Sequence, residues 1–305
     1  MPRPAGLVLA AVLLLALPGC FGGGAREVPA HLAGGNAASV QGEKEYRKGC
    51  WQKALKHFTR AWELEVLAAD TDKKAVALNN MGNCHRMLGD PQTAAAFLEE
   101  AAKMFSRAGD AAGEIRARIN LAAALADAGR ADSAKRELSR ALALPGGADY
   151  WPLWNVRGIM ALDAGDLEEA GKCLDRALAA PGGPEGGRAA AHYSMGRLML
   201  ETGKLDAAQE HFSTAFSADR QDGYFPGVAD DLLGLGRVAE ALGNLSEAAG
   251  YYADAAQVYG LLGMDGKAQD ALSRLEAADG GEGAVVTRHF LAWWGEGYTL
   301  EAPCE

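Results

Sequence analysis

The residues of this chain that could do chemistry do not assemble into a catalytic pattern. The sequence contains no metalloprotease HExxH, no nucleophile-elbow GxSxG, no phosphate-binding loop and no Cys-x-x-Cys pair. The acidic pairs Glu99-Glu100 and Glu168-Glu169 fall in stretches predicted to be helical. We interpret them as solvent-exposed surface residues rather than as catalytic carboxylates. We therefore predict that the protein is not an enzyme and holds no cofactor or metal. The histidines are scattered, at His31, His57, His85, His192, His211 and His289.

The first twenty residues have the pattern of an export signal. Arg3 gives a basic start, and the apolar run from Ala5 to Leu17 is too short to span a bilayer stably. The run ends at Leu17-Pro18-Gly19-Cys20, which resembles the processing site of bacterial lipoproteins. The resemblance implies a signal peptide over 1–19, a lipid such as palmitate on Cys20, and a flexible tether over 20–35. An ordinary cleaved signal with a chance cysteine is the alternative.

The residue after that cysteine bears on the cellular location, and the net charge bears on the class of partner. Because Phe21 rather than Asp follows Cys20, the lipoprotein resemblance implies an outer-membrane location facing the periplasm. Removal of residues 1–19 loses one of 30 basic residues, Arg3, so the mature chain carries 29 basic and 40 acidic residues and a formal net charge of −11. Such a chain repels nucleic acid, whose binding needs neutralised phosphates.

A repeated helical hairpin organises the rest of the chain. A glycine that permits a left-handed turn recurs at spacings of 40, 40, 36, 38 and 40 residues. A small residue lies seven positions before each glycine, an alanine five after it, and a large apolar residue nine after it. These small and large residues predict closely packed helix pairs that must stack on their neighbours to bury a core. The turn glycines are Gly49, Gly89, Gly129, Gly165, Gly203 and Gly243.

At these positions the chain resembles the tetratricopeptide repeat family. The family's Ala-x3-Phe element is present as Ala54 to Phe58 and Ala208 to Phe212, and its Leu-Gly element as Leu235-Gly236. The resemblance implies an all-α, superhelical solenoid of about six hairpins with a C-terminal capping helix. The family unit has 34 residues, whereas the units here are longer. The extra residues lie between hairpins, at 70–73, 107–113, 145–149, 181–187 and 219–227. Several of these segments are rich in Gly or Pro and should be loops, whereas the sequence around 107–113 indicates a lengthened second helix followed by a new helix start.

The predicted organisation therefore has four parts. The signal and the tether come first, and an aromatic tail over 279–305 comes last, either as a helix folded back on the solenoid or as a docking segment. Between them, the solenoid covers 36–278, with units at 36–66, 75–105, 114–144, 150–180, 188–218 and 228–262 and a cap at 267–278. Of the remaining cysteines, Cys50 and Cys84 would lie at similar ends of neighbouring units; separate thiols are favoured over a disulfide between them.

The family resemblance also implies a binding surface. In that family the first helix of each unit lines a concave groove. When the repeat positions of the family are matched to this sequence, the groove positions hold amides, arginines and one tyrosine. Amides can bond a peptide backbone as donor and acceptor, and arginine suits carboxylates. The alternative is that these residues are ordinary polar groups on a solvent-exposed surface with no role in binding. The predicted set is Asn79, Asn80, Asn83, Arg86, Arg116, Asn120, Asn155, Tyr193, Arg197 and Arg237.

The function predicted from these features is a membrane-anchored scaffold or adaptor that binds proteins or extended peptide segments of the cell envelope. Resemblance by class points to pilus, secretion or outer-membrane assembly. A lipoprotein that binds peptidoglycan or polysaccharide is the alternative, and it would use exposed aromatic rings. The candidates for such rings are the C-terminal tail and Tyr150, Trp151, Tyr224 and Phe225.

Overall fold

The computed structural model describes residues 34–181, 188–281, 283–296 and 304. In this part the chain forms fourteen α-helices and one short 3-10 helix, with no strand, which confirms the all-α prediction. Cys20 and residues 1–19 lie outside the described residues. The six hairpins are α1 (Gly34–Arg47) with α2 (Trp51–Leu67), α3 (Thr71–Met87) with α4 (Pro91–Ala108), α5 (Ala111–Asp127) with α6 (Ala131–Leu142), α7 (Trp151–Asp163) with α8 (Leu167–Ala179), α9 (Ala189–Glu201) with α10 (Leu205–Asp222), and α11 (Phe225–Ala241) with α12 (Leu245–Leu261).

Each hairpin turns at the predicted glycine. All six turn glycines have φ between 72° and 85°, the left-handed region that glycine adopts at little cost. Two of the turns continue with an aspartate that starts the next helix. The side chain of Asp90 accepts from the amide of Thr93 at 3.1 Å, and Asp166 accepts from Glu169 at 3.0 Å. The short glycine turn therefore ends one helix and allows the next to begin at once.

Within a hairpin the two helices touch where the small and large residues of the pattern face each other. A β-carbon on Gly82 would lie 2.6 Å from Cγ of Leu98, and one on Gly236 would lie 2.5 Å from Cε1 of Tyr252. Gly42, Gly158 and Gly196 make the same approach to the large residue of their own hairpins. The small residue therefore sets how closely the paired helices pack.

The extra residues between hairpins mostly lengthen helices. As predicted, α4 continues to Ala108 before α5 starts at Ala111. The extra segment 219–227 contains Gly and Pro but is mostly helical, because α10 runs to Asp222 and α11 starts at Phe225, with left-handed Gly223 between them. A Gly/Pro-rich connection does occur before α7, where the chain forms the 3-10 helix η1 (Gly147–Asp149). Residues 182–187 lie outside the described part.

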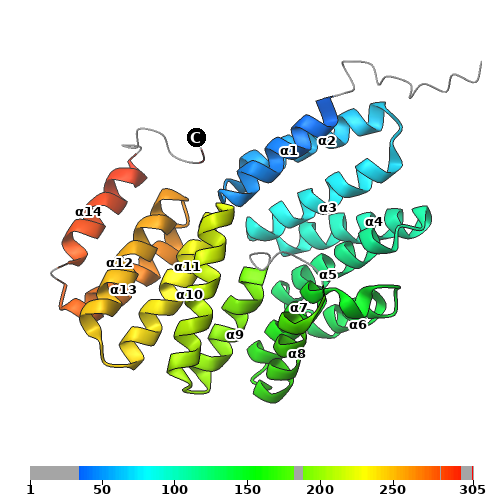
Figure 1. Ribbon diagram of the computed structural model, residues 1–305. Coiled ribbons are helices and arrows are strands. Elements are labelled where there is room, and N and C mark those ends of the chain that lie inside the picture. Colours follow the sequence, from blue (N-terminus) through cyan, green and yellow to red (C-terminus); the bar gives the residue numbers. More distant parts are fainter. Residues whose placement is uncertain (1–33, 182–187, 282, 297–303, 305) are drawn as a thin grey trace, which may run out of the picture.

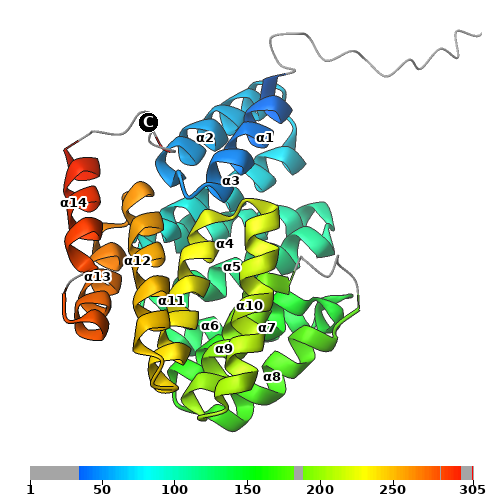
Figure 2. The same ribbon diagram turned by 60° about the vertical axis from the view of Figure 1, so that its left-hand side comes forward.

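The hairpins stack in order and wind into an arc that brings its two ends together (Figure 1). The α1–α2 hairpin lies beside the start of α11 in both ribbon views (Figure 2). A β-carbon on Gly49, in the α1–α2 turn, would lie 2.9 Å from Cγ of Pro226 and 3.5 Å from Leu262. The superhelix therefore closes on itself, although nothing in the repeat pattern indicates where the ends meet.

The cysteine prediction needs a correction at Cys50. Cys50 is bonded to Cys304, with Cα atoms 4.8 Å apart, and neither pairs with Cys84. Cys84 and Cys173 are free and buried, as the favoured prediction of separate thiols expects for these two. The sequence could not show this pairing, because it depends on the superhelical closure rather than on contacts between neighbouring units.

Two helices follow the sixth hairpin. The capping helix α13 (Asp265–Asp279) packs on α12, and α14 (Ala284–Gly295) packs on both. Leu291 and Trp294 of α14 cover Gly260, whereas Val286 and Trp293 are 59% and 46% exposed. The part of the aromatic tail in α14 is therefore folded against the last hairpin. Among the described helices, none has both the length and the apolar character to cross a membrane.

Candidate functional site

The first helices of successive hairpins lie side by side and carry the predicted surface. Helix α5 contacts α3 and α7, and α9 contacts α7 and α11. Figure 1 shows α5 and α7 on the inner side of the arc, with α6 and α8 outside them. The inner face, as the term is used from here, is the surface formed by the predicted residues on α3, α5, α9 and α11.

Three asparagines form a hydrogen-bonded chain at the start of the inner face. Nδ2 of Asn120 donates to Oδ1 of Asn79 at 3.0 Å, and Nδ2 of Asn79 donates to Oδ1 of Asn80 at 3.2 Å. The chain joins α3 to α5, and all three side chains are half-buried. Each amide has both donor and acceptor atoms, so the chain fixes side chains that can also bond an extended backbone.

A pocket of about 350 Å³ opens beside these amides. Asn80 and Asn83 form one wall, and the first hairpin forms the other with aromatic and charged side chains. The pocket therefore combines apolar surface with a few polar groups, the composition typical of sites that bind small groups or side chains. Its remaining lining residues are Glu43, Tyr46, Arg47 and Phe58.

Two of the predicted arginines pair with acids of a neighbouring hairpin. Arg86 of α3 bonds Asp127 at the end of α5 at 3.1 Å, and Arg197 of α9 bonds Asp163 at the end of α7 at 2.9 Å. Asp127 and Asp163 are about half exposed, with side-chain exposures of 49% and 58%. Ion pairs this open contribute little to stability, so a partner carboxylate could replace the acid.

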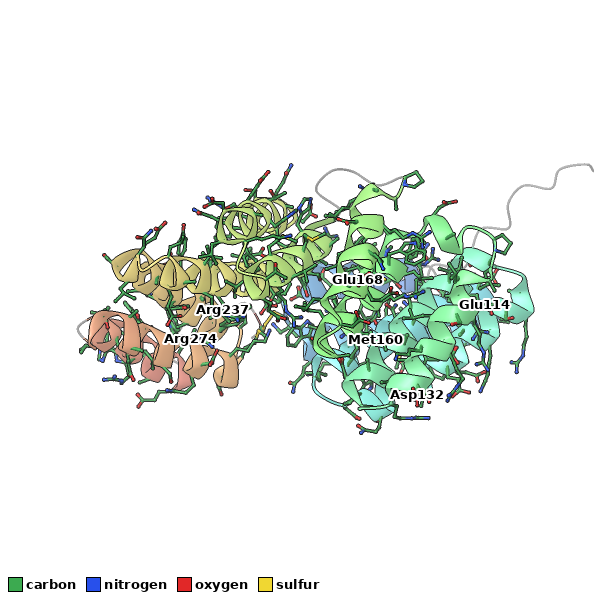
Figure 3. The ribbon with its side chains drawn as sticks, turned by 90° about the horizontal axis from the view of Figure 1, so that it is seen from below. Glu114, Asp132, Met160, Glu168, Arg237 and Arg274 are labelled. Atoms are coloured by element: carbon green, nitrogen blue, oxygen red, sulfur yellow. A yellow bond between two sulfur atoms is a disulfide. The ribbon has the colours of Figure 1, made fainter. Side chains whose placement is uncertain are left out.

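The remaining predicted residues differ in exposure. Arg116 and Arg237 are exposed, and Figure 3 shows Arg237 near Arg274 on the C-terminal half, away from Met160 on the other half. Tyr193 packs edge-on against Phe212 with ring centroids 5.7 Å apart. Asn155 is only 6% exposed and belongs to the core, so a bound partner would not reach it.

The aromatic residues considered for sugar binding are mostly part of the packing. Tyr150 and Trp151 are partly buried against the hydrophobic core, and burial raises the pKa of Tyr150. Phe225 is 40% exposed, and Tyr224 is half-buried. A flat, open aromatic platform is therefore absent from these four described residues.

The sequence reading missed a polar cluster on the last hairpins. The hydroxyl of Tyr259 donates to Oδ1 of Asp230 at 2.6 Å, and Nζ of Lys267 donates to the same atom at 2.6 Å. This cluster joins α11 to α12 and α13. The adjacent aspartates Asp230 and Asp231 near the start of an apolar helix were the signal that could have indicated it.

Two carboxyl groups are buried where α10 meets α11. Asp231 is 0% exposed and neither carboxyl oxygen has a hydrogen-bond partner in the described part of the chain. Burial, followed by the neighbouring charges of Asp219 and Asp230, raises its pKa to about 9. Burial and the charges of Asp222 and Asp230 likewise raise the pKa of Asp219 to about 7. These groups are buried within the packing between helices and do not form an open acidic surface.

A histidine pair lies between α9 and α10. Nδ1 of His192 and Nδ1 of His211 are 3.0 Å apart, so one neutral ring donates to the other. Burial lowers the pKa of both, and for His192 the charges of His211 and Arg188 lower it further. Within the described residues, no three metal-ligating side chains come together. The pair is explained as a neutral hydrogen bond between helices.

Comparison with protein families identifies the repeat. One family model described as Tetratricopeptide repeat matches residues 36–107, 75–145 and 151–221, and a second with the same description matches 193–259. Together they cover most of the chain and span all six hairpins. No curated protein matches the chain.

Solved structures give the same fold at low sequence identity. A Rap protein complexed with competence and sporulation factor has a TM-score of 0.57 and 17% identity, covering 87% of this chain and 77% of its own. The Rap conjugation regulator of plasmid pLS20, in complex with the Phr* peptide, has a TM-score of 0.56 and 17% identity, with 92% and 84% covered. The apo quorum sensor NprR from B. thuringiensis has a TM-score of 0.50 and 14% identity, with 85% and 75% covered.

Proposed function

The chain belongs to the tetratricopeptide repeat family, and from that membership we propose that it is a non-catalytic scaffold that holds an extended segment of a partner protein on its inner face. The observation that carries the proposal is the asparagine chain from Asn120 through Asn79 to Asn80 beside the pocket. Amides fixed in this way can bond backbone groups of a peptide without fresh loss of side-chain freedom.

Charge and fold support a peptide with acidic groups. Arg86 and Arg197 pair with acids that are about half exposed, and Arg116 and Arg237 are exposed. Arginine binds carboxylates bidentately, so carboxylates of the partner would bind along this row. Two proteins of similar fold are described in complexes, one with competence and sporulation factor and the other with a Phr* peptide, so this fold is able to hold such ligands.

Peptide selection on the chain from residue 21 onwards would test this role. Peptides selected from a random library should bind the wild type, and reversal of charge in Arg197→Glu with Arg237→Glu should weaken binding at least tenfold by fluorescence anisotropy. Arg136→Glu is the matched control, because Arg136 is an exposed arginine on outer helix α6. Equal affinity of the reversed and control variants, with both folded, would contradict binding on the inner face.

A second part of the proposal concerns location. We propose that lipid on Cys20 tethers the scaffold to the outer membrane with the solenoid in the periplasm, close to envelope proteins that it helps to assemble. The sequence around Cys20 supports the anchor, and the Cys50–Cys304 bond supports an oxidising compartment. A tether of this kind raises the local concentration of bound partners near the membrane.

The anchor is testable separately from binding. Metabolic labelling with palmitate should mark the wild type and not Cys20→Ser, and the variant should move from the membrane to the soluble fraction. Cys84→Ser is the control, because that thiol is buried within the second hairpin. Unlabelled wild type, or a Cys20→Ser variant that stays on the membrane, would refute the anchor without affecting the binding role.

A further inference from the structure

The two ends of the superhelix meet along a seam. On one side is the α1–α2 turn with Gly49, and on the other are Pro226 at the start of α11 and Leu262 at the end of α12. A β-carbon on Gly49 would lie 2.9 Å from Pro226, so no larger residue fits without movement. Pro226 and Leu262 are both buried. The first hairpin is therefore packed against the last one, although the repeat itself does not require this contact.

A disulfide crosses this seam. Cys50 is the residue before α2 and is 2% exposed, and it is bonded to Cys304, 254 positions later in the chain. Helices α2 to α14 lie within the loop that this bond closes, and α1 precedes it. The bond therefore links the first turn of the solenoid covalently to Cys304, which lines the same pocket as the α12–α13 turn.

A pocket opens on the seam next to the disulfide. Its volume is about 570 Å³, and both cysteines line it. Met87 and Leu88 of the second hairpin and the α12–α13 turn complete its walls. Cys304 is half-buried rather than fully covered. A small reductant can therefore approach the bond from this pocket.

Another part of the seam brings aromatic and charged side chains within electrostatic range of one another. Tyr224, just before α11, lies within electrostatic range of Tyr46 of α1 and Arg86 of α3. Burial raises the pKa of Tyr46 to about 12, with the positive charge of Arg86 opposing the rise. Tyr46 also lines the pocket beside the asparagine chain. Closure of the seam therefore covers one end of the inner face.

From this geometry we propose that the Cys50–Cys304 disulfide is a redox-controlled clasp that keeps the superhelix closed. When it is intact, the first hairpin is held against α11 and α12, and Tyr46 and Tyr224 stay half-buried. When it is reduced, the first hairpin separates and exposes that end of the inner face. The proposal concerns the fold and does not depend on any partner.

A dithiol reductant opens the clasp by exchange. One thiolate of the reductant attacks a sulfur of the disulfide and forms a mixed disulfide, which releases the other cysteine as a thiolate that takes up a proton. The second thiolate of the reductant then attacks its own mixed-disulfide sulfur and releases the remaining cysteine, which is also protonated. Two electrons and two protons pass to the protein, and the dithiol becomes an intramolecular disulfide.

The two free cysteines, Cys84 and Cys173, should not take part in thiol–disulfide exchange. Burial raises the pKa of Cys84 to about 12 and that of Cys173 to about 11, so both remain protonated thiols at neutral pH. Since the thiolate is the reactive form, neither exchanges readily. A change on mild reduction would therefore report on the clasp.

Hydroxyl-radical footprinting with mass spectrometry tests the clasp directly. The chain from residue 21 is labelled when oxidised, after reduction with dithiothreitol, and as Cys304→Ser. We expect labelling of Tyr46 and Tyr224 to rise at least threefold in the reduced protein and in the variant. Labelling of Tyr252, which is buried inside the sixth hairpin, should not change.

Three results would overturn the proposal. The first is a non-reduced peptide map that lacks a Cys50–Cys304 linkage. The second is unchanged labelling of Tyr46 after complete reduction. The third is a rise that includes Tyr252, because that would mean general unfolding rather than opening of the seam. Reduced wild type and Cys304→Ser serve as independent routes to the same state, so a folding defect in the variant alone does not decide the outcome.

Discussion

Two regions of the solenoid have the same close packing of small against large residues within their hairpins but differ in their polar groups. Between α3 and α5, neutral amides bond one another across the hairpins, through Asn120 and Asn79. Between α10 and α11, the buried carboxyls of Asp219 and Asp231 face a packed interface, and those of Asp231 have no hydrogen-bond partner in the described part. The bonded amides do not titrate, whereas the two carboxyl groups have pKa values raised to about 7 and about 9.

The close packing itself is the same in both regions. Gly82 faces Leu98 in the second hairpin, and Gly236 faces Tyr252 in the sixth, each with less than 3 Å available to an added β-carbon. Helix pairing is therefore set by small residues against large ones, independently of the polar groups nearby. The repeat therefore fixes where the helices touch, while the polar residues decide how stability responds to pH.

The largest expected effect comes from Asp231→Asn. A carboxyl whose folded pKa is about 9 stabilises the fold fully below its unfolded pKa near 4, and this contribution is lost as pH rises towards 9. Asparagine has nearly the same shape and no charge to lose. At pH 8, about four pH units above the unfolded pKa, the variant should be more stable by about 5 kcal/mol, and at pH 4 it should differ little. Urea unfolding at both pH values measures this.

Asp219→Asn sharpens the same test. Because the pKa of Asp219 is raised only to about 7, its contribution is lost between about pH 4 and pH 7 and changes no further above that. The gain should therefore be smaller than for Asp231→Asn and should level off at neutral pH. Stability gains that do not depend on pH in either variant would show that these carboxyls are not the titrating groups.

The shared close packing predicts equal damage in both regions. Gly82→Ala and Gly236→Ala each force a β-carbon against Leu98 or Tyr252, and we expect a loss of about 2 kcal/mol from overpacking in each. Gly250→Ala is the matched control, because Gly250 lies inside α12 with nothing within 4 Å of the added carbon. The control should gain about 0.5–1 kcal/mol, since alanine favours the helix. Thermal unfolding of the three variants measures the contrast.

Much of the fold could be predicted from the sequence, because the glycine turns and the small–large pairs are local features. Gly49 and the five later turn glycines have the expected left-handed backbone. The seam could not be predicted, because a small rotation at each of six hairpins decides whether the ends meet. The pairing of Cys50 with Cys304 depends on that accumulated rotation, and so does the approach of Tyr46 to Tyr224.

The candidate site was predictable only in part. Asn79, Asn80 and Asn120, which the repeat register assigns to one face, do lie together, because neighbouring first helices place equivalent positions side by side. Their role in binding stays a prediction. The same register failed at Asn155, which is buried. Position within a repeat fixes the direction of a side chain along the helix, but burial also depends on the local rotation between hairpins, which differs where the spacing shortens from 40 to 36 residues.

The smallest expected change in stability comes from the amide region, in Asn79→Ala. Asn79→Ala removes the bond from Asn120 at 3.0 Å and the bond to Asn80 at 3.2 Å, and it leaves two half-buried amides without those partners. Water can reach half-buried groups, so the loss should be about 1 kcal/mol. Because none of the three bonded asparagines titrates, the loss should be equal at pH 6 and pH 8. The stability change of Asp231→Asn, by contrast, should depend on pH. Asn36→Ala, on the exposed start of α1, should leave stability unchanged. A pH-dependent loss for Asn79→Ala would mean that the two regions are coupled through the closed superhelix, so that the carboxyls act on the amide region as well.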